Sequence, residues 1–228
     1  MLDQLSDDIQ EEASTEETED LEEIVGQTVI EHVTLADLRN LITNNHDESK
    51  SAEEALREQG IYYLTGEITQ KLITPIHQDI FCKHLDPDWT GDISIIVSSP
   101  GGELPAAWML IDLFSIINMK VHTLGTGLCC SAASMIVAAG TKGLRCVTPN
   151  CEIMIHLGSG ATDGEMETVL AQAEGFRLEV NRMVDFWAAR SKYKTVKSVK
   201  ANLLNKRDFY LTPRQALRHG IVDTVTGK

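Results

Sequence analysis

The chain has 228 residues, 43% of them hydrophobic, which is enough for one sizeable buried core. Its formal net charge of −14 is unevenly distributed, because residues 1–24 contain eleven Asp or Glu and no Lys or Arg. The charge of the remaining residues is nearly balanced, which argues against a nucleic-acid-binding protein. The sequence contains no run of about 18 apolar residues, so a membrane-spanning helix is not expected.

The N-terminus and the cysteines indicate the compartment and the absence of a cofactor. The acidic start resembles neither a secretion signal nor an Arg-rich transit peptide, so we expect a cytoplasmic protein. The cysteines are odd in number and lack paired CxxC spacing, so we expect neither a disulfide framework nor a metal site. We also expect no cofactor. The cysteines are Cys82, Cys129, Cys130, Cys146 and Cys151.

The chain divides into two segments near residue 50. Residues 1–50 are predicted to form an acidic N-terminal extension, and residues 51–228 a single catalytic domain. Ser51 and Glu54 have the spacing of a capping box, and Gly60 is placed to end the helix that they begin. The folded domain is therefore expected to start with a short helix.

Strand-like and helix-like segments then alternate. Short β-branched runs are separated by longer segments with helical spacing of apolar residues, and Pro105 suits the first turn of one helix. This alternation predicts an α/β fold. The predicted strands are 61–64, 93–97, 121–124, 144–148 and 152–157, and the predicted helices are 68–85, 105–117 and a segment ending at Gly140.

A long helix is predicted after residue 164. Apolar residues recur there at steps of three and four, so one face is apolar throughout. That face either belongs to the core of this chain or reaches out to a second copy, and periodicity alone does not choose. The residues are Met166, Val169, Ala173, Phe176, Val180, Met183 and Trp187.

Ser134 is the first candidate nucleophile. It follows a turn of small residues and precedes the apolar segment 136–139, so its hydroxyl is expected at a turn that leads into a helix, where backbone N–H groups can face an oxyanion. Ser131 competes with Ser134, and Ser98 and Ser99 also remain open. Spacing does not decide among them.

A serine nucleophile needs a base and an orienting group. His156 ends an apolar strand, and imidazole titrates near neutral pH, so it is the candidate base. Asp208 is the candidate carboxylate that holds the imidazole tautomer. The glycine pair of the segment 100–102 allows close backbone approach, so the N–H groups of Gly102 and Met135 are the candidate oxyanion donors.

Several motifs in one order resemble the proteolytic subunit of the Clp (caseinolytic) protease family, from about Ser51 to Val225. No single motif is specific, but their shared order is a strong signal. The motifs are Ile61-Tyr-Tyr-Leu-Thr-Gly66, Ser99-Pro-Gly-Gly102, Ser131-Ala-Ala-Ser-Met135, Met154-Ile-His156, Arg207-Asp208 with Tyr210-Leu-Thr212, and His219-Gly-Ile-Val-Asp223.

The resemblance implies a crotonase-like fold of repeated ββα units with a protruding handle helix over 164–190. It implies Ser134 rather than Ser131 as nucleophile, His156 as base, Asp208 as orienting carboxylate, and Gly102 and Met135 as oxyanion donors. It also implies two stacked heptameric rings that receive unfolded polypeptides from an ATP-driven AAA+ unfoldase, with a propeptide and axial loops in the N-terminal region. The chain itself has no GxxxxGK[ST] phosphate loop.

The expected function is therefore that of a serine endopeptidase inside a self-compartmentalised assembly. The alternatives are a catalytically silent or regulatory ring subunit and a dedicated processing protease, for example in viral capsid maturation. An acyl-CoA-processing enzyme of the same broad fold would not need a serine nucleophile, and a serine-lysine peptidase would use Lys142.

Overall fold

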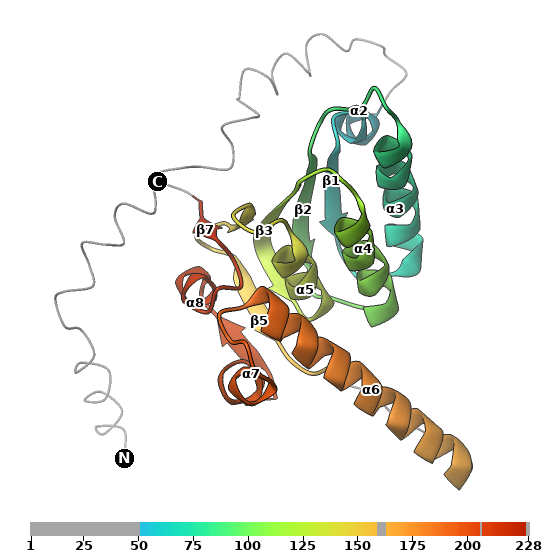
Figure 1. Cartoon of the computed structure of the whole chain (residues 1–228), viewed down its shortest axis with the longest axis vertical. Coiled ribbons are helices and arrows are strands. Elements are labelled where there is room, and N and C mark those ends of the chain that lie inside the picture. The colour runs from blue at the N-terminus through green and yellow to red at the C-terminus, as the bar shows by residue number, and fades with distance from the viewer. Residues whose placement is uncertain (1–50, 159–162, 206, 227–228) are drawn as a thin grey trace, which may run out of the picture.

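The computed structural model describes residues 51–158, 163–205 and 207–226. The predicted N-terminal extension lies outside the described residues. Within them, the predicted alternation of strands and helices is confirmed, and the chain has a mixed α/β fold (Figure 1).

The domain begins with α2 (Ala52–Glu58), whose capping box at Ser51 and Glu54 is present as predicted. Ser51 accepts from the backbone N–H of Glu54, and the Glu54 carboxylate accepts from the N–H of Ser51. Gly60 has a φ of 75°, a conformation that favours glycine, and it turns the chain into β1 (Ile61–Thr65).

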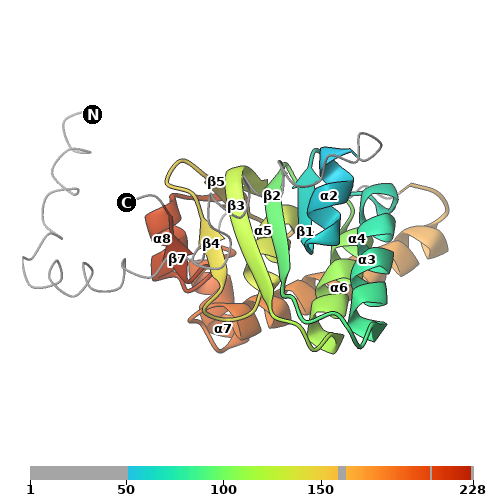
Figure 2. The same ribbon diagram turned by 90° about the horizontal axis from the view of Figure 1, so that it is seen from above.

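The centre of the domain is a parallel sheet in the order β1-β2-β3-β4-β7 (Figure 2). The four strands after β1 are β2 (Ile93–Ser99), β3 (Val121–Cys130), β4 (Arg145–Val147) and β7 (Thr224–Val225). The strand β5 (Glu152–Ile155) continues alongside the far end of β3, and β6 (Phe209–Leu211) pairs antiparallel with β5. β3 thus supports β4 with its first half and β5 with its second half.

Three helices cover one face of this sheet (Figure 2). They are α3 (Gln70–Leu85), α4 (Leu104–Ile116) and α5 (Ala132–Ala139). All eight residues of α5 are buried, so this helix lies in the middle of the core. Pro105 occupies the first turn of α4 as predicted, and α3 continues through Pro75.

Two predicted boundaries move at the end of β3. The strand predicted over residues 121–124 does not end there but continues to Cys130. The following helix begins at Ala132, earlier than the apolar run 136–139 indicated. The junction between strand and helix therefore falls at Ser131.

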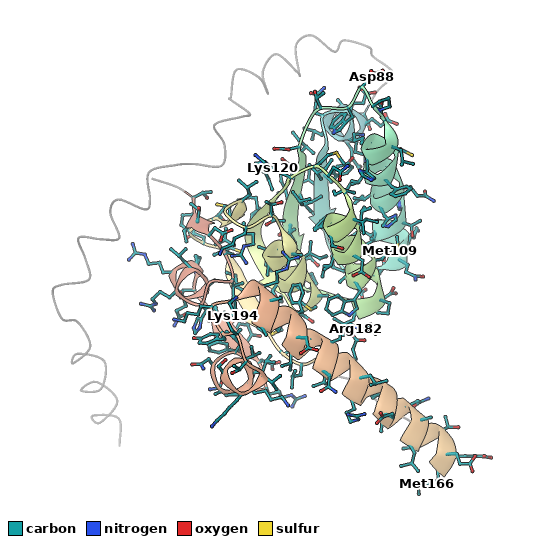
Figure 3. All side chains as sticks on the ribbon, in the orientation of Figure 1. Asp88, Met109, Lys120, Met166, Arg182 and Lys194 are labelled. Atoms are coloured by element: carbon teal, nitrogen blue, oxygen red, sulfur yellow. The ribbon has the colours of Figure 1, made fainter. Side chains whose placement is uncertain are left out.

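The long helix is α6 (Met166–Arg190), and its two ends differ (Figure 1). Near its C-terminal end, Met183, Val184, Phe186 and Trp187 are buried in the core. Its N-terminal half extends away from the body of the domain to Met166, which lies at the tip (Figure 3) and is 72% exposed. Phe176 is 45% exposed, so the predicted apolar face is covered by this chain only at its base.

The last part of the domain packs against the base of α6 and was not predicted in detail. It contains α7 (Val196–Asn202), then β6, α8 (Pro213–Arg218) and β7. Thr212 caps α8 through a capping box with Gln215, and Pro213 starts the helix.

A search of the described ranges finds no helix that is both long and apolar enough to cross a membrane. Over the same ranges, no group of three or more His, Cys, Asp or Glu side chains is placed to hold a metal ion.

Candidate active site

Ser131 occupies the sharp turn between β3 and α5. Its φ of 55° and ψ of −125° make it the one non-glycine residue with positive φ in the part of the chain that the structure describes. A serine rarely adopts this conformation unless the surrounding structure enforces it. A strained turn from strand to helix is the geometry that exposes the nucleophilic serine of α/β-hydrolases.

The turn is held by close backbone packing. The N–H of Ser131 donates to the carbonyl of Met154 on β5 at 2.8 Å. A Cβ at Gly101 would lie only 2.7 Å from the Cβ of Ser131 and 2.7 Å from the carbonyl oxygen of Cys130. Gly101 therefore has to be glycine, both for this contact and for its φ of 100°.

The pairing of β5 with β6 brings His156 and Asp208 together. The antiparallel register joins Ile155 to Phe209, so the next position along both strands faces His156 toward Asp208. The His156 Nδ1 lies 3.2 Å from the Asp208 Oδ1. The predicted contact between these two residues, which are 52 positions apart in sequence, is confirmed.

His156 Nε2 lies 2.7 Å from the Oγ of Ser131. The three side chains thus form one hydrogen-bonded series, Ser131–His156–Asp208. When Nδ1–H donates to the carboxylate, Nε2 carries the lone pair that accepts from the serine hydroxyl. The arrangement is suited to removing the proton of Ser131.

The prediction that Ser134 lies beside His156 is wrong. Ser134 is in the first turn of α5, it is 2% exposed, and its Oγ donates to the backbone carbonyl of Ser131 at 2.7 Å. A serine bonded to the carbonyl three residues earlier is a common arrangement within a helix. The hydroxyl therefore points along the helix instead of toward the imidazole.

The prediction for Met135 is wrong for the same reason. Its backbone N–H donates to the carbonyl of Ser131 at 3.4 Å and is part of the helix. The free amide next to the serine is that of Ala132, the first residue of α5, which donates no hydrogen bond within the described chain. Amides at this position of a helix have no intrahelical acceptor.

Gly102, the other predicted oxyanion donor, lies on the segment that packs against the serine turn. It follows Gly101, whose Cβ position would lie 3.2 Å from the N of Ala132. Two backbone hydrogen bonds to Ile68 hold the chain on either side of Gly102. The Ile68 N–H donates to the carbonyl of Gly101, and the Glu103 N–H donates to the carbonyl of Ile68. The N–H of Gly102 itself has no acceptor among the described residues, and a Cβ there would lie 2.2 Å from the Ile68 oxygen.

Other reactive side chains are buried, protonated or distant from the serine turn. Ser99 is buried and its Oγ accepts from the N–H of Gly101 at 3.0 Å, which is a structural role. Cys130 adjoins Ser131, but burial and the nearby charge of Glu152 raise the pKa of its thiol to about 11, so it is protonated at neutral pH. Lys142 lines a different cavity, together with Arg145 and Arg190.

Comparison with known proteins identifies the family of this chain. The family model for Clp protease matches residues 44–228, which is most of the chain. The chain belongs to the Clp protease family. This family consists of serine peptidases, and the mixed α/β fold with a central sheet agrees with membership.

The alignments with two curated relatives include most of this chain and most of each relative. The "ATP-dependent Clp protease proteolytic subunit 1" of Shouchella clausii (strain KSM-K16) is 27% identical over 184 residues, which is 80% of this chain and 93% of the relative. The "ATP-dependent Clp protease proteolytic subunit" of Ligilactobacillus salivarius (strain UCC118) is 28% identical over 193 residues, 82% of this chain and 95% of the relative.

Proposed function

We propose that this chain is a serine peptidase in which Ser131 is the nucleophile, His156 the general base and Asp208 the orienting carboxylate. The observation that carries the proposal is the continuous series of hydrogen bonds from Ser131 through His156 to Asp208. His156 Nε2 takes the hydroxyl proton as the Ser131 Oγ attacks the peptide carbonyl. The bond to Asp208 stabilises the imidazolium that results.

The oxyanion of the tetrahedral intermediate is assigned to two backbone amides. The N–H groups of Ala132 and Gly102 are unpaired within the described chain and lie on the two segments that meet at the serine turn. Collapse of the intermediate transfers the proton from His156 to the leaving amine and leaves an ester on Ser131. A water molecule, activated by the same imidazole, then hydrolyses that ester.

The substrate and the assembly are inferred from the family and from α6. The two curated relatives are named as proteolytic subunits of ATP-dependent proteases, and this chain has no phosphate-binding loop of its own. We assign it unfolded polypeptides as substrates and an AAA+ unfoldase as the ATP-using partner. The exposed half of α6 supports a homo-oligomer, which we place in the heptameric, stacked rings expected from the resemblance.

The main alternative to an active peptidase is a catalytically silent subunit, and an experiment has to distinguish the two. A silent subunit needs no hydrogen bond from a histidine to a strained serine, so the geometry at Ser131 favours the enzyme. A dedicated processing protease would share the chemistry and differ only in its substrate.

The test is labelling with a fluorophosphonate probe followed by intact mass measurement, on wild type, Ser131→Ala and Ser134→Ala. We expect one adduct on wild type and on Ser134→Ala, and none on Ser131→Ala. Peptide hydrolysis by Ser131→Ala should fall by about 10⁴- to 10⁶-fold, because the nucleophile and its base act as a unit. Ser134→Ala is the matched control, since it removes the same hydroxyl three residues away.

Two results would contradict the assignment. Loss of the adduct in Ser134→Ala with retention in Ser131→Ala would restore Ser134 as the nucleophile. An unlabelled wild type that is correctly assembled and has been given an unfoldase would identify a silent subunit.

A further inference from the structure

A cationic cavity lies at the base of α6, where the C-terminal end of the helix meets the loop after α5. Its volume is about 310 Å³. Four Lys or Arg side chains line it in addition to the buried Arg145, and Asp223 is the one acidic residue of the lining. The cationic residues are Lys142, Arg145, Arg190, Lys192 and Lys194.

The single carboxylate is already fully used. Asp223 accepts from Arg145 Nε at 2.8 Å and Nη2 at 2.6 Å, and from the N–H of Gly143 at 2.7 Å. Arg145 is 5% exposed and donates its remaining groups to the carbonyls of Arg190 and Gly220. This buried pair therefore neutralises itself and leaves the other cations of the cavity uncompensated.

Those other cations have no acidic partner within the described ranges. Arg190 is half-buried and its one hydrogen bond, to the carbonyl of Gly140, is long at 3.5 Å. Burial and the nearby Arg145 lower its pKa, as expected where cations lie close together without an anion. Lys194 Nζ donates to backbone carbonyls, and Lys142 and Lys192 are exposed at the rim.

Some cations elsewhere in the described chain do have acidic partners, although surface residues such as Lys71 and Lys120 also lack one. Elsewhere, Lys83 pairs with Asp79 at 3.0 Å, Arg57 with Glu53 at 2.7 Å, and Arg182 with Glu179 at 3.3 Å. What distinguishes the base of α6 is that four cations without an acidic partner among the described residues line the same cavity.

The same polypeptide carries the complementary charge. Residues 1–24 contain eleven Asp or Glu and no Lys or Arg, which is −11 of the total formal charge of −14. A connecting stretch over residues 25–50 can span up to about 90 Å when extended, whereas a domain of this size has a radius of gyration of about 16 Å. Every face of the domain is therefore within reach of the acidic segment.

We propose that the acidic segment 1–24 binds in cis to the cationic cavity formed by Lys142, Arg190, Lys192 and Lys194. The cavity is open at its rim, where the lysines are exposed, so it admits side-chain carboxylates from an extended peptide. Binding there would neutralise the repulsion around Arg190, the last residue of α6. The acidic segment would in this way act on the base of the long helix, a role separate from peptide hydrolysis.

The experiment is zero-length carbodiimide cross-linking of the full chain, which joins carboxylates to lysines that lie in direct contact. Trypsin releases the acidic segment as the single peptide 1–39, because Arg39 is the first Lys or Arg of the chain. We expect this peptide to be linked to Lys142, Lys192 or Lys194 and not to Lys71 or Lys120, which lie elsewhere. The links should disappear at high salt, since exposed ion pairs are screened.

The decisive variant is Arg190→Gln, because arginine does not react with the reagent and all three acceptor lysines remain. Cross-links to the cavity should fall by roughly two- to fivefold when this charge is removed. Arg214→Gln removes an exposed arginine from α8 and should leave the yield unchanged. Near-ultraviolet circular dichroism of each variant checks that the fold is retained.

A mixture of isotopically heavy and light chains tests whether binding is in cis. Links within one isotopic form support the proposal, whereas links mainly between heavy and light chains would overturn it in favour of a second copy. Links spread evenly over all surface lysines, no links at the cavity, or equal yields in Arg190→Gln and wild type would each refute it.

Discussion

The strand ends around Ser131 and the N-terminal half of α6 are constrained in opposite ways. Ser131 and His156 are fixed by backbone hydrogen bonds and strand register, which place their reacting atoms 2.7 Å apart. The tip of α6 is a regular helix whose apolar side chains are exposed, with Leu170 at 62% and Phe176 at 45%. The first region is complete within one chain, and the second presents an apolar face that this chain leaves uncovered.

The base of α6 lies between these extremes. It is anchored by side-chain packing around Trp187, whose ring lies edge-on to that of Phe186 with 5.2 Å between the ring centroids. It is also held by Arg145, whose guanidinium donates to the carbonyl of Arg190 at 2.7 Å. Substitutions in the three regions should therefore affect three different properties, namely catalysis, stability and assembly.

Asp208→Asn should have the largest effect of the four substitutions considered below, and it should act on catalysis alone. An amide can donate to Nδ1 and so favours the wrong imidazole tautomer, which lowers kcat by about 10²- to 10⁴-fold. The Asp208 side chain is 43% exposed, so water screens its charge and can reduce the loss of kcat toward about 10²-fold. Peptide hydrolysis measures the change, and Asp112→Asn, an exposed carboxylate on α4, is the control. An unchanged kcat would remove Asp208 from the site.

Trp187→Ala should instead reduce stability. Trp187 is fully buried, so its removal leaves a cavity that costs about 3–5 kcal/mol in the free energy of unfolding. Urea denaturation measures this cost. Trp187→Phe should be milder, because the indole Nε1 has no hydrogen-bond partner within the described chain and its loss breaks no bond. Equal costs for the two variants would show that the base of α6 is not held by packing.

Asp223→Asn tests the ion pair that supports the end of α6. Burial opposes ionisation of Asp223, but hydrogen bonds and charge from Arg145 outweigh it and hold the pKa below its usual value. A carboxylate with a depressed pKa in the folded state stabilises the protein above its unfolded-state pKa, and the contribution is lost as the pH falls through the folded-state pKa.

The substitution should therefore cost about 3 kcal/mol at pH 7, where it leaves Arg145 buried without its partner. The difference from wild type should begin to shrink below about pH 4, where the carboxylate is protonated in the unfolded state. It should disappear only below the depressed folded-state pKa of Asp223. Urea unfolding at pH 7 and pH 3 measures both values. A difference that is the same at both pH values would mean that the charge of Asp223 does not stabilise the fold.

The sequence predicted the order of elements well, because each depends on local patterns. Ser51 and Pro105 lie at the starts of the helices predicted from them, and the spacing of apolar residues predicts α6 from Met166 to Trp187, all but its last turn. The contact between His156 and Asp208 was also anticipated, although it depends on the register of β5 and β6.

The choice between Ser131 and Ser134 could not be made from local pattern. The glycines of residues 125–127 are typical of a turn, yet β3 continues through them. Gly125 pairs with Val97 of β2 and Val147 of β4, and residues 128–130 pair with β5. Extending the strand to Cys130 and starting the helix at Ala132 moves the turn by three residues. The positive φ of Ser131 is imposed by packing against Gly101, which only the folded chain reveals.

Phe176→Asp should have the smallest effect on the isolated chain and a clear effect on assembly. Phe176 is exposed on the projecting half of α6, so the free energy of unfolding should change by no more than about 0.5 kcal/mol. A charge on an apolar face that meets another subunit should nevertheless weaken that contact and release smaller assemblies. Light scattering measures the assembly, and Glu174→Asp, a conservative change two residues away, is the control. A fully assembled Phe176→Asp variant would show that this face of α6 is not an interface, and the comparison between a self-sufficient site and a helix that needs a partner would then fail.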